Sequence, residues 1–231
     1  MTFSRLLLSV LLTFAALSSA GVASSASAAT PPPATELKHW VVEQMPGGRA
    51  TERDDTLEIA DAAGCTAWWR EKLTAPVEIS YEVTVVMAGG PQDRLSDLNC
   101  FWMAGDPGST TAPFVVKPRS GKFSDYDSLF TYYVGYGGNN NSTTRFRRYD
   151  GTPDRPLLPE HDLREKKVLL EPNRTYHLRL VARDGRAEFY RDGEKIFTFR
   201  DPTPLTSGWF AIRTVRSHLL VRNVVIKRPT P

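Results

Sequence analysis

The sequence lacks the short motifs that identify several common enzyme classes. It has no G-x-S-x-G elbow, no H-E-x-x-H pair and no phosphate-binding P-loop. It also has no cluster of cysteine and histidine with the spacing of a zinc site. These absences give no support for a serine hydrolase of the elbow type, a zinc protease or a P-loop enzyme.

Cysteine is also scarce, with Cys65 and Cys100 as the two examples in 231 residues. Each lies beside aromatic residues of a predicted strand. In an exported protein such a pair can oxidise to a disulfide. The alternative is two buried free thiols, because unpaired cysteine behaves as a small apolar residue. The sequence leaves both open.

Long apolar runs are absent except at the start of the chain. There, Arg5 is followed by an apolar run from Leu6 to about Leu17 and by the small residues that end at Ala28. This order predicts a signal peptide over residues 1–28, because its apolar core is too short for a membrane anchor.

We therefore expect a secreted protein that has no stable membrane association once the signal peptide is removed. The proline-rich residues 29–36 are predicted to form a linker, and residues 37–228 a single domain. A domain of this size can bury a sizeable core without a partner, so we expect a monomer.

Excess charge of one sign is a further absence. The chain has 29 basic and 26 acidic residues, a net charge of +3. Residues 1–28 contain one arginine and no acidic residue, so their removal leaves a net charge of +2. Proteins that bind nucleic acids usually carry a clustered basic surplus, and no nucleic-acid partner is predicted here.

Helical periodicity is missing from the mature chain, and short alternating runs rich in valine, isoleucine and aromatic residues take its place. The pairs Asp184-Gly185 and Asp192-Gly193 separate three such runs. Because Asp-Gly tolerates the positive φ angles of two-residue hairpins, these runs predict an antiparallel meander. Its predicted core residues are Leu178, Leu180, Phe189, Phe197 and Phe199.

Nine further runs are predicted to be strands, and the charged, proline-containing stretch Thr152–Lys167 a long loop. About a dozen short strands without helices predict an all-β fold, with two antiparallel sheets packed as a sandwich or jelly roll. The runs are LKHWVVE, DTLEIA, TAWWREKL, VEISYEVTVVM, LNCFWMA, LFTYYVGYG, TTRFRRY, GWFAIRT and SHLLVRNVVIK.

Six motifs together carry a resemblance to a known family. They are DLNCFWMAGDP, YYVGYGGNNNSTTRFRRYDG, RPLLPEHDL, LEPNRTYHLRLV, FYRDGEKIF and GWFAIRT. Over roughly Leu37 to Arg228 the chain resembles a poorly characterised bacterial family of secreted or lipid-anchored proteins, often encoded near genes for polysaccharide degradation. The resemblance implies a jelly-roll sandwich of the concanavalin A-like lectin/glucanase type and a polysaccharide or oligosaccharide partner. It implies no particular reaction.

In related jelly rolls the glycan lies on the concave face of one sheet, where flat aromatic rings and planar amides contact the sugars. The resemblance thus makes Asn99, Trp102, Tyr133 and Tyr136 candidate substrate-binding residues. Because side chains alternate along a strand, only one parity of each strand faces such a groove. The sequence does not determine which parity it is.

The stretch NNNSTTRFRRYDG, residues 139–151, combines amides, hydroxyls and three arginines. As a strand, it places Arg145, Arg147 and Tyr149 on one face and Phe146 on the other. A solvated sheet face would explain this pattern. However, like charges on one face repel unless an anion or nearby acids compensate them. A uronate carboxylate would be such an anion.

We therefore expect a carbohydrate-active protein, and favour a polysaccharide lyase that cleaves a uronate-containing glycan by β-elimination. The reaction needs a cation for the carboxylate, a base and a proton donor. We assign Arg145 and Arg147 to the carboxylate, Tyr149 as acid or base, and His161 as base. A non-catalytic, lectin-like glycan-binding module is the alternative, and an exposed loop position the alternative for His161.

A third hypothesis is a glycoside hydrolase. The stretch EHDLRE has the acid spacing of laminarinase-type hydrolases, with Glu160 and Glu165 as candidate acids beside Asp162. Its intervening residues are not the apolar ones expected within a core strand, which disfavours this assignment. We predict no cofactor and assign no metal ligands. Many jelly rolls hold a structural calcium ion, but no pattern here identifies a site for one.

Overall fold

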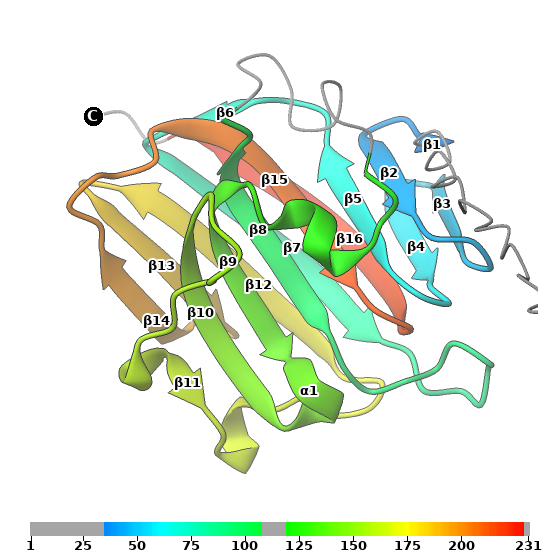
Figure 1. The fold of residues 1–231 in the computed structure, drawn as a ribbon. Coiled ribbons are helices and arrows are strands. Elements are labelled where there is room, and N and C mark those ends of the chain that lie inside the picture. Colours follow the sequence, from blue (N-terminus) through cyan, green and yellow to red (C-terminus); the bar gives the residue numbers. More distant parts are fainter. Residues whose placement is uncertain (1–34, 108–118, 229–231) are drawn as a thin grey trace, which may run out of the picture. The chain divides into compact units, whose positions relative to one another are not determined.

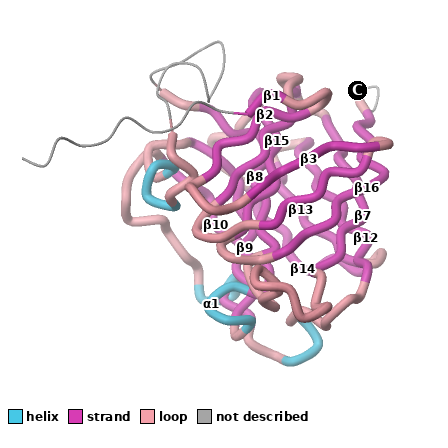
Figure 2. Tube along the Cα trace, turned by 90° about the vertical axis from the view of Figure 1, so that its right-hand side faces the viewer, coloured by secondary structure: helices cyan, strands magenta, loops and turns pink. Residues whose placement is uncertain are grey.

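Two antiparallel β-sheets packed face to face form the computed structural model, which describes residues 35–107 and 119–228 (Figures 1 and 2). This confirms the predicted all-β sandwich. The described residues belong to the compact unit Pro31–Pro231. The predicted signal peptide and nearly all of the predicted linker lie outside the described residues. None of the helices in the described ranges is long and apolar enough to cross a membrane.

The larger sheet, which we call sheet A, has the strand order β1-β2-β5-β15-β8-β9-β10-β11, with β6 paired to β15. Strands β2 and β10, each next to a two-residue edge strand, are thus separated by four strands. The strands are β1 (Thr35–Glu36), β2 (Trp40–Gln44), β5 (Cys65–Trp69), β6 (Leu73–Thr74), β8 (Leu98–Gly105), β9 (Phe130–Gly137), β10 (Thr143–Asp150), β11 (Asp162–Leu163) and β15 (Ser207–Thr214).

The smaller sheet, sheet B, has the order β14-β13-β12-β7-β16-β4-β3. It contains the predicted meander, in which Asp184 and Gly185 have φ angles of 51° and 69°. Both Asp-Gly hairpins are confirmed. The strands are β3 (Arg49–Arg53), β4 (Thr56–Ala60), β7 (Val77–Val85), β12 (Thr175–Arg183), β13 (Arg186–Arg191), β14 (Glu194–Arg200) and β16 (His218–Lys227).

The main core lies between the two sheets and contains the five predicted core residues of the meander, with Phe199 partly buried. Cys65 and Cys100 also lie there as free thiols, in strands that flank β15 on opposite sides. The predicted alternative of two buried thiols is therefore the one observed. Burial raises the pKa of Cys100 to about 12, so this thiol stays protonated and unreactive at neutral pH.

The outer face of sheet A carries a second apolar cluster, which a loop covers. The short 3₁₀ helix η1 (Phe123–Tyr126) lies over this face (Figure 1). Glu43 in β2 accepts hydrogen bonds from Tyr126 at 2.8 Å and from the Trp68 indole at 2.9 Å, and lies 3.6 Å from the Arg119 guanidinium. These buried contacts hold the η1 segment against the outer face of sheet A.

The stretch Thr152–Lys167 is more structured than predicted. It contains the 3₁₀ helix η2 (Pro159–His161), strand β11 and the start of the 3₁₀ helix η3 (Lys166–Val168). Strand β11 pairs with the edge strand β10 through Thr144 and Arg145. Two residues are too few to show the alternation that reveals a strand in a sequence.

Candidate functional site

The three asparagines that precede β10 form a left-handed turn. The φ angles of Asn139, Asn140 and Asn141 are 53°, 58° and 58° in the element α1 (Gly138–Asn141). Asparagine tolerates this conformation better than most residues. The Asn141 side chain accepts a hydrogen bond from the Leu170 N–H and donates one to the Leu170 carbonyl. The amides therefore reverse the chain between β9 and β10.

Strand β10 alternates as the sequence predicts. Phe146 is buried in the core between the sheets, whereas Tyr149 belongs to the apolar cluster on the outer face of sheet A. Arg147 is directly opposite Tyr133 of β9, and Arg145 is opposite Gly135. Arg145, Arg147, Tyr149 and Tyr133 thus share the outer face, because residues two apart point the same way.

These side chains line a cavity of about 120 Å³, which we call the arginine–tyrosine pocket. A Cβ atom at Gly135 would lie 3.0 Å from the Tyr133 hydroxyl, so the glycine gives this phenol the room to lie close to the sheet. The pocket is lined by Asp97, Phe123, Tyr133, Gly135, Gly138, Asn139, Thr143, Arg145, Arg147, Tyr149 and Arg155.

Two of the three arginines in the pocket have carboxylate partners. Arg145 donates two hydrogen bonds to Asp162, at 2.8 and 3.1 Å, and these bonds hold the pKa of Asp162 at about 2. Arg155 donates to Asp127 at 2.8 Å and lies over the Phe123 ring. The charges of these two arginines are therefore compensated within the chain.

Arg147 differs because the described residues provide it with no carboxylate. Its guanidinium donates to the backbone carbonyl of Arg155. Burial lowers the pKa of Arg147, and the charges of Arg145 and Arg155 lower it further. The side chain is half-buried. A half-buried cation between two other cations is a favourable position for an anion.

The hydroxyl of Tyr149 is a second unsatisfied group in the pocket. It is buried and has no hydrogen-bond partner among the described residues. Burial raises its pKa to about 12, so Tyr149 is protonated at neutral pH and can donate a hydrogen bond. Leaving a buried hydroxyl unpaired costs about 1 to 3 kcal/mol, which a ligand oxygen would recover.

The other predicted site residues divide between the two faces of sheet A. Asn99 is opposite Gly135, and its side-chain oxygen is buried without a partner among the described residues. Trp102 and Tyr136 are instead buried between the sheets, where Trp102 donates to the Val181 carbonyl. They have the opposite parity to Asn99 and Tyr133, so they do not line the pocket.

His161 does not line the arginine–tyrosine pocket, but it lines a second cavity of about 190 Å³ together with Arg147. Its ring packs edge-on against Phe146, with centroids 4.9 Å apart, and also contacts Phe197 and Phe199. Phe146 and Tyr149 face opposite sides of β10, so His161 lies on the inner side. Burial lowers the pKa of His161. His161 is therefore placed apart from Tyr149, and its role as a base stays a prediction.

The candidate hydrolase acids differ from one another in exposure and in their partners. Glu160 and Glu165 are exposed, and Asp162 is bound by Arg145 and Arg164. A general acid needs a raised pKa, whereas the pKa of Asp162 is lowered. This arrangement disfavours Asp162 as a proton donor.

Sequence reasoning assigned no role to several residues of the pocket, among them Asp97, Phe123 and Arg155. Asp97 and Phe123 lie far from β10 in the sequence, and Arg155 lies in the loop that follows β10. Asp97 accepts hydrogen bonds from Arg94 at 2.8 Å and from the Ser96 hydroxyl at 2.9 Å, which hold it at the edge of the pocket. No alternation or motif marks these loop positions.

Several solved structures share the fold. One is a protein of unknown function with a galectin-like fold from Bacillus subtilis, with a TM-score of 0.61 and 14% identity over 86% of this chain and 97% of that chain. The carbohydrate-binding module CBM66 from Bacillus subtilis gives 0.55 and 11%, covering 85% and 99%. The Emp47p carbohydrate recognition domain gives 0.53 and 12%, covering 86% and 94%. At these identities the likeness shows the fold.

In sequence, the family model described as "Domain of unknown function (DUF6250)" matches residues 59–224. This range contains β10 and every residue that lines the arginine–tyrosine pocket. No curated protein matches the chain.

Proposed function

The chain belongs to the DUF6250 family, and we propose that it is a non-catalytic protein that binds the carboxylate of an acidic glycan in the arginine–tyrosine pocket. One observation carries the proposal. Arg147 lacks a carboxylate partner in the described residues and shares the pocket with the unpaired, buried hydroxyl of Tyr149. A uronate carboxylate satisfies both groups.

The chemistry of the two groups matches a carboxylate. A guanidinium presents parallel N–H groups that pair with two carboxylate oxygens, and the phenol supplies a further donor. Hydrogen bonds to charged groups contribute about 1.5 to 3 kcal/mol each. The pocket of about 120 Å³ has room for the acidic group and part of one sugar ring. Tyr133 and Phe123 add aromatic side chains to the lining of the pocket.

The comparisons support a carbohydrate as the ligand. Two structures with the same fold are named as a carbohydrate-binding module and as a carbohydrate recognition domain. They support the choice of ligand class because the chain shares their fold. The selection of an acidic sugar rests on Arg147 and Tyr149 alone.

A lyase is the second candidate, and protonated Tyr149 is the observation that favours it. In β-elimination a base removes the proton beside the carboxylate, the bond to the leaving oxygen breaks, and an acid protonates that oxygen. Arg147 would neutralise the carboxylate and Tyr149 would supply the final proton. Among the described residues that line the pocket the only carboxylate is Asp97, which Arg94 already binds, and none is histidine. We therefore place binding first.

We also propose that the chain is exported and acts as a monomer. The support for export is the apolar run and small-residue end of residues 1–28. Export is tested by fractionating the native host: the chain should be recovered outside the cytoplasm without residues 1–28. Recovery of the uncut chain in the cytoplasm would contradict it.

A glycan panel tests the function. Oligogalacturonate, oligomannuronate and neutral cello-oligosaccharides are titrated into the protein by calorimetry, and the products are followed by ultraviolet absorbance and by reducing ends. We expect saturable binding of at least one acidic oligosaccharide, none of the neutral series, and no product. An unsaturated product would show that the protein is a lyase. New reducing ends without unsaturation would show that it is a hydrolase. Binding of the neutral series alone would overturn the proposal.

A further inference from the structure

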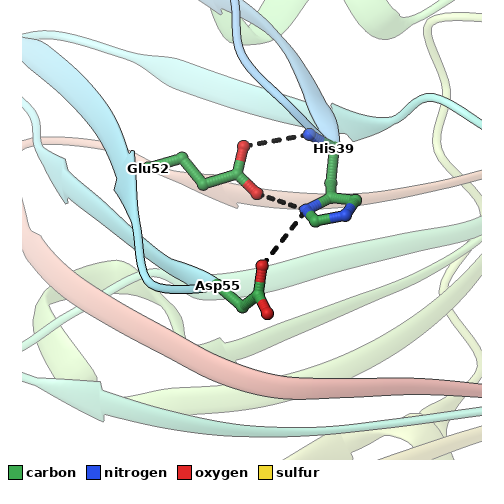
Figure 3. Close-up of side chains that lie close together, drawn as sticks. All are labelled: His39, Glu52 and Asp55. Carbon is green, nitrogen blue, oxygen red and sulfur yellow. Dashed lines mark hydrogen bonds and ion pairs between the residues drawn. The ribbon is translucent and has the colours of Figure 1, made fainter.

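A second cluster of titratable groups lies at the opposite edge of sheet A from the pocket. His39 precedes β2, Glu52 lies in β3, and Asp55 lies in the turn between β3 and β4. The His39 Nδ1 atom is 2.5 Å from Glu52 Oε1 and 3.9 Å from Asp55 Oδ1. Each of the three residues offers one potential ligand atom, and these three atoms all lie within 4.8 Å of one another (Figure 3).

The two carboxylates converge on the same nitrogen atom. Nδ1 carries at most one proton, which can be given to one carboxylate oxygen at a time. His218 provides a contrast within the same chain. Its Nδ1 lies 3.0 Å from Asp93 and its Nε2 lies 3.0 Å from Glu58, so each carboxylate faces a different nitrogen. A protonated ring satisfies that arrangement fully, and a single metal ion cannot bind both nitrogens of one ring.

Two of the three groups at the His39 cluster are held in place. The ring of His39 is stacked on Trp69, with centroids 5.3 Å apart and planes at 5°. The Glu52 side chain is 4% exposed, and its second oxygen accepts the His39 backbone N–H at 2.9 Å. Such supporting contacts fix the orientation of metal ligands in proteins.

The third group is free to adjust. Asp55 forms an ion pair with Lys38 at 2.8 Å, but both side chains are about 70% exposed. Exposed ion pairs contribute little to stability. The Asp55 carboxylate can therefore leave Lys38 for a divalent cation without a large loss. Beside the cluster lies a cavity of about 490 Å³, lined also by Trp40, Thr56 and Asn223.

We propose that His39 Nδ1, Glu52 Oε1 and Asp55 Oδ1 bind a divalent transition-metal ion of the zinc class. One imidazole nitrogen with two carboxylate oxygens suits zinc, whereas calcium prefers oxygen ligands alone. Three protein ligands leave a position for water or a ligand in the adjoining cavity. The ion would connect the β2 edge of sheet A to the β3–β4 hairpin of sheet B. This inference does not depend on the proposed glycan function.

Zinc titration of the untagged protein, after removal of metals by a chelator, tests the site. We expect one zinc ion per chain by calorimetry and a higher melting temperature with zinc than with chelator. The substitutions His39→Gln and Asp55→Asn should each weaken zinc binding by about tenfold or more, since the first removes the imidazole nitrogen and the second the carboxylate charge. Asp55 is exposed in a turn, so its variant remains informative even if the His39 variant folds poorly.

The matched control is His218→Gln, which removes a histidine that also lies between two carboxylates. We expect its zinc affinity to equal that of the unaltered protein. Absence of saturable zinc binding, or an equal loss in the His218 and His39 variants, would overturn the proposal. Calcium that binds as tightly as zinc and competes for the same site would overturn the assigned metal class.

Discussion

The two pockets at opposite edges of sheet A have opposite charge balance. Three arginines and one carboxylate line the arginine–tyrosine pocket beside β10. Three carboxylates and one arginine line the cavity beside His39. In the first pocket one charged group, Arg147, has no carboxylate partner among the described residues, and in the second two carboxylates approach the same His39 nitrogen. The first arrangement favours an anion as the ligand, and the second favours a cation.

Of the substitutions proposed, replacement of Arg147 should weaken the binding of an acidic ligand most. We expect Arg147→Gln to weaken binding of the acidic oligosaccharide by roughly 10- to 150-fold, because it removes hydrogen bonds from a charged donor. Arg228→Gln changes the net charge equally at an exposed position that pairs with Glu71, and should leave the affinity unchanged. Calorimetric titration checks both. Equal losses of affinity in the two variants would show that the effect comes from net charge and not from Arg147 itself.

Replacing Tyr149 should change binding and stability in opposite directions. We expect Tyr149→Phe to weaken acidic-oligosaccharide binding by about tenfold, since a hydrogen bond to a charged group contributes about 1.5 kcal/mol or more. The free energy of unfolding should stay equal or rise by about 1 kcal/mol, because the hydroxyl is buried without a partner in the described residues. Denaturant unfolding measures this. A loss of stability together with unchanged binding would assign the hydroxyl a structural role.

Removing the carboxylate that pairs with Arg145 should increase the difference in charge balance between the two pockets. We expect Asp162→Asn to tighten acidic-oligosaccharide binding by about threefold, since a second guanidinium loses its charged partner.

The same substitution should cost about 1 to 2 kcal/mol of stability at neutral pH. The pKa of Asp162 is lowered from 3.8 to about 2, so its contribution is present above about pH 4 and is lost as the pH falls through about 2. Unfolding from pH 7 to 2 checks this. Equal stability of the two proteins at pH 7 would contradict it.

Replacing His161 should affect binding least. We expect His161→Ala to change the affinity for acidic oligosaccharide by less than about twofold, because the ring lies on the inner side of β10. Stability should fall by about 1 to 3 kcal/mol from the lost packing on Phe146, Phe197 and Phe199. Binding and unfolding measurements separate the two effects. Loss of binding in a fully stable variant would restore His161 to the site.

Local patterns made part of this structure predictable. The Asp-Gly hairpins and the separation of Phe146 from Arg147 and Tyr149 depend on neighbours within a few residues, and both were predicted. Which alternate residues of β8 and β9 face the second sheet was not predicted. Alternation divides the residues of a strand into two sets, but it does not say which set faces the other sheet. Trp102 and Tyr136 were therefore grouped with Tyr133 although they lie between the sheets.

The features that the sequence did not predict depend on contacts between segments that are distant in the sequence. His39 shows no local motif, and its cluster forms because β2 and the β3–β4 hairpin lie at the same edge of the two sheets. Likewise, Arg155 reaches the pocket through Asp127 and Phe123, which belong to another loop. Strand β3, with the sequence RATER, has no apolar alternation by which it could be predicted.

The most direct test of the account compares two ligands with two proteins. An acidic oligosaccharide and its methyl ester are titrated into the unaltered protein and into Arg147→Gln. Because Arg147 is proposed to bind the carboxylate itself, the acid should bind the unaltered protein at least about tenfold more tightly than the ester, a difference of about 1.4 kcal/mol. The variant should bind the two ligands equally. Equal binding of acid and ester by the unaltered protein would contradict the claim that Arg147 recognises a carboxylate.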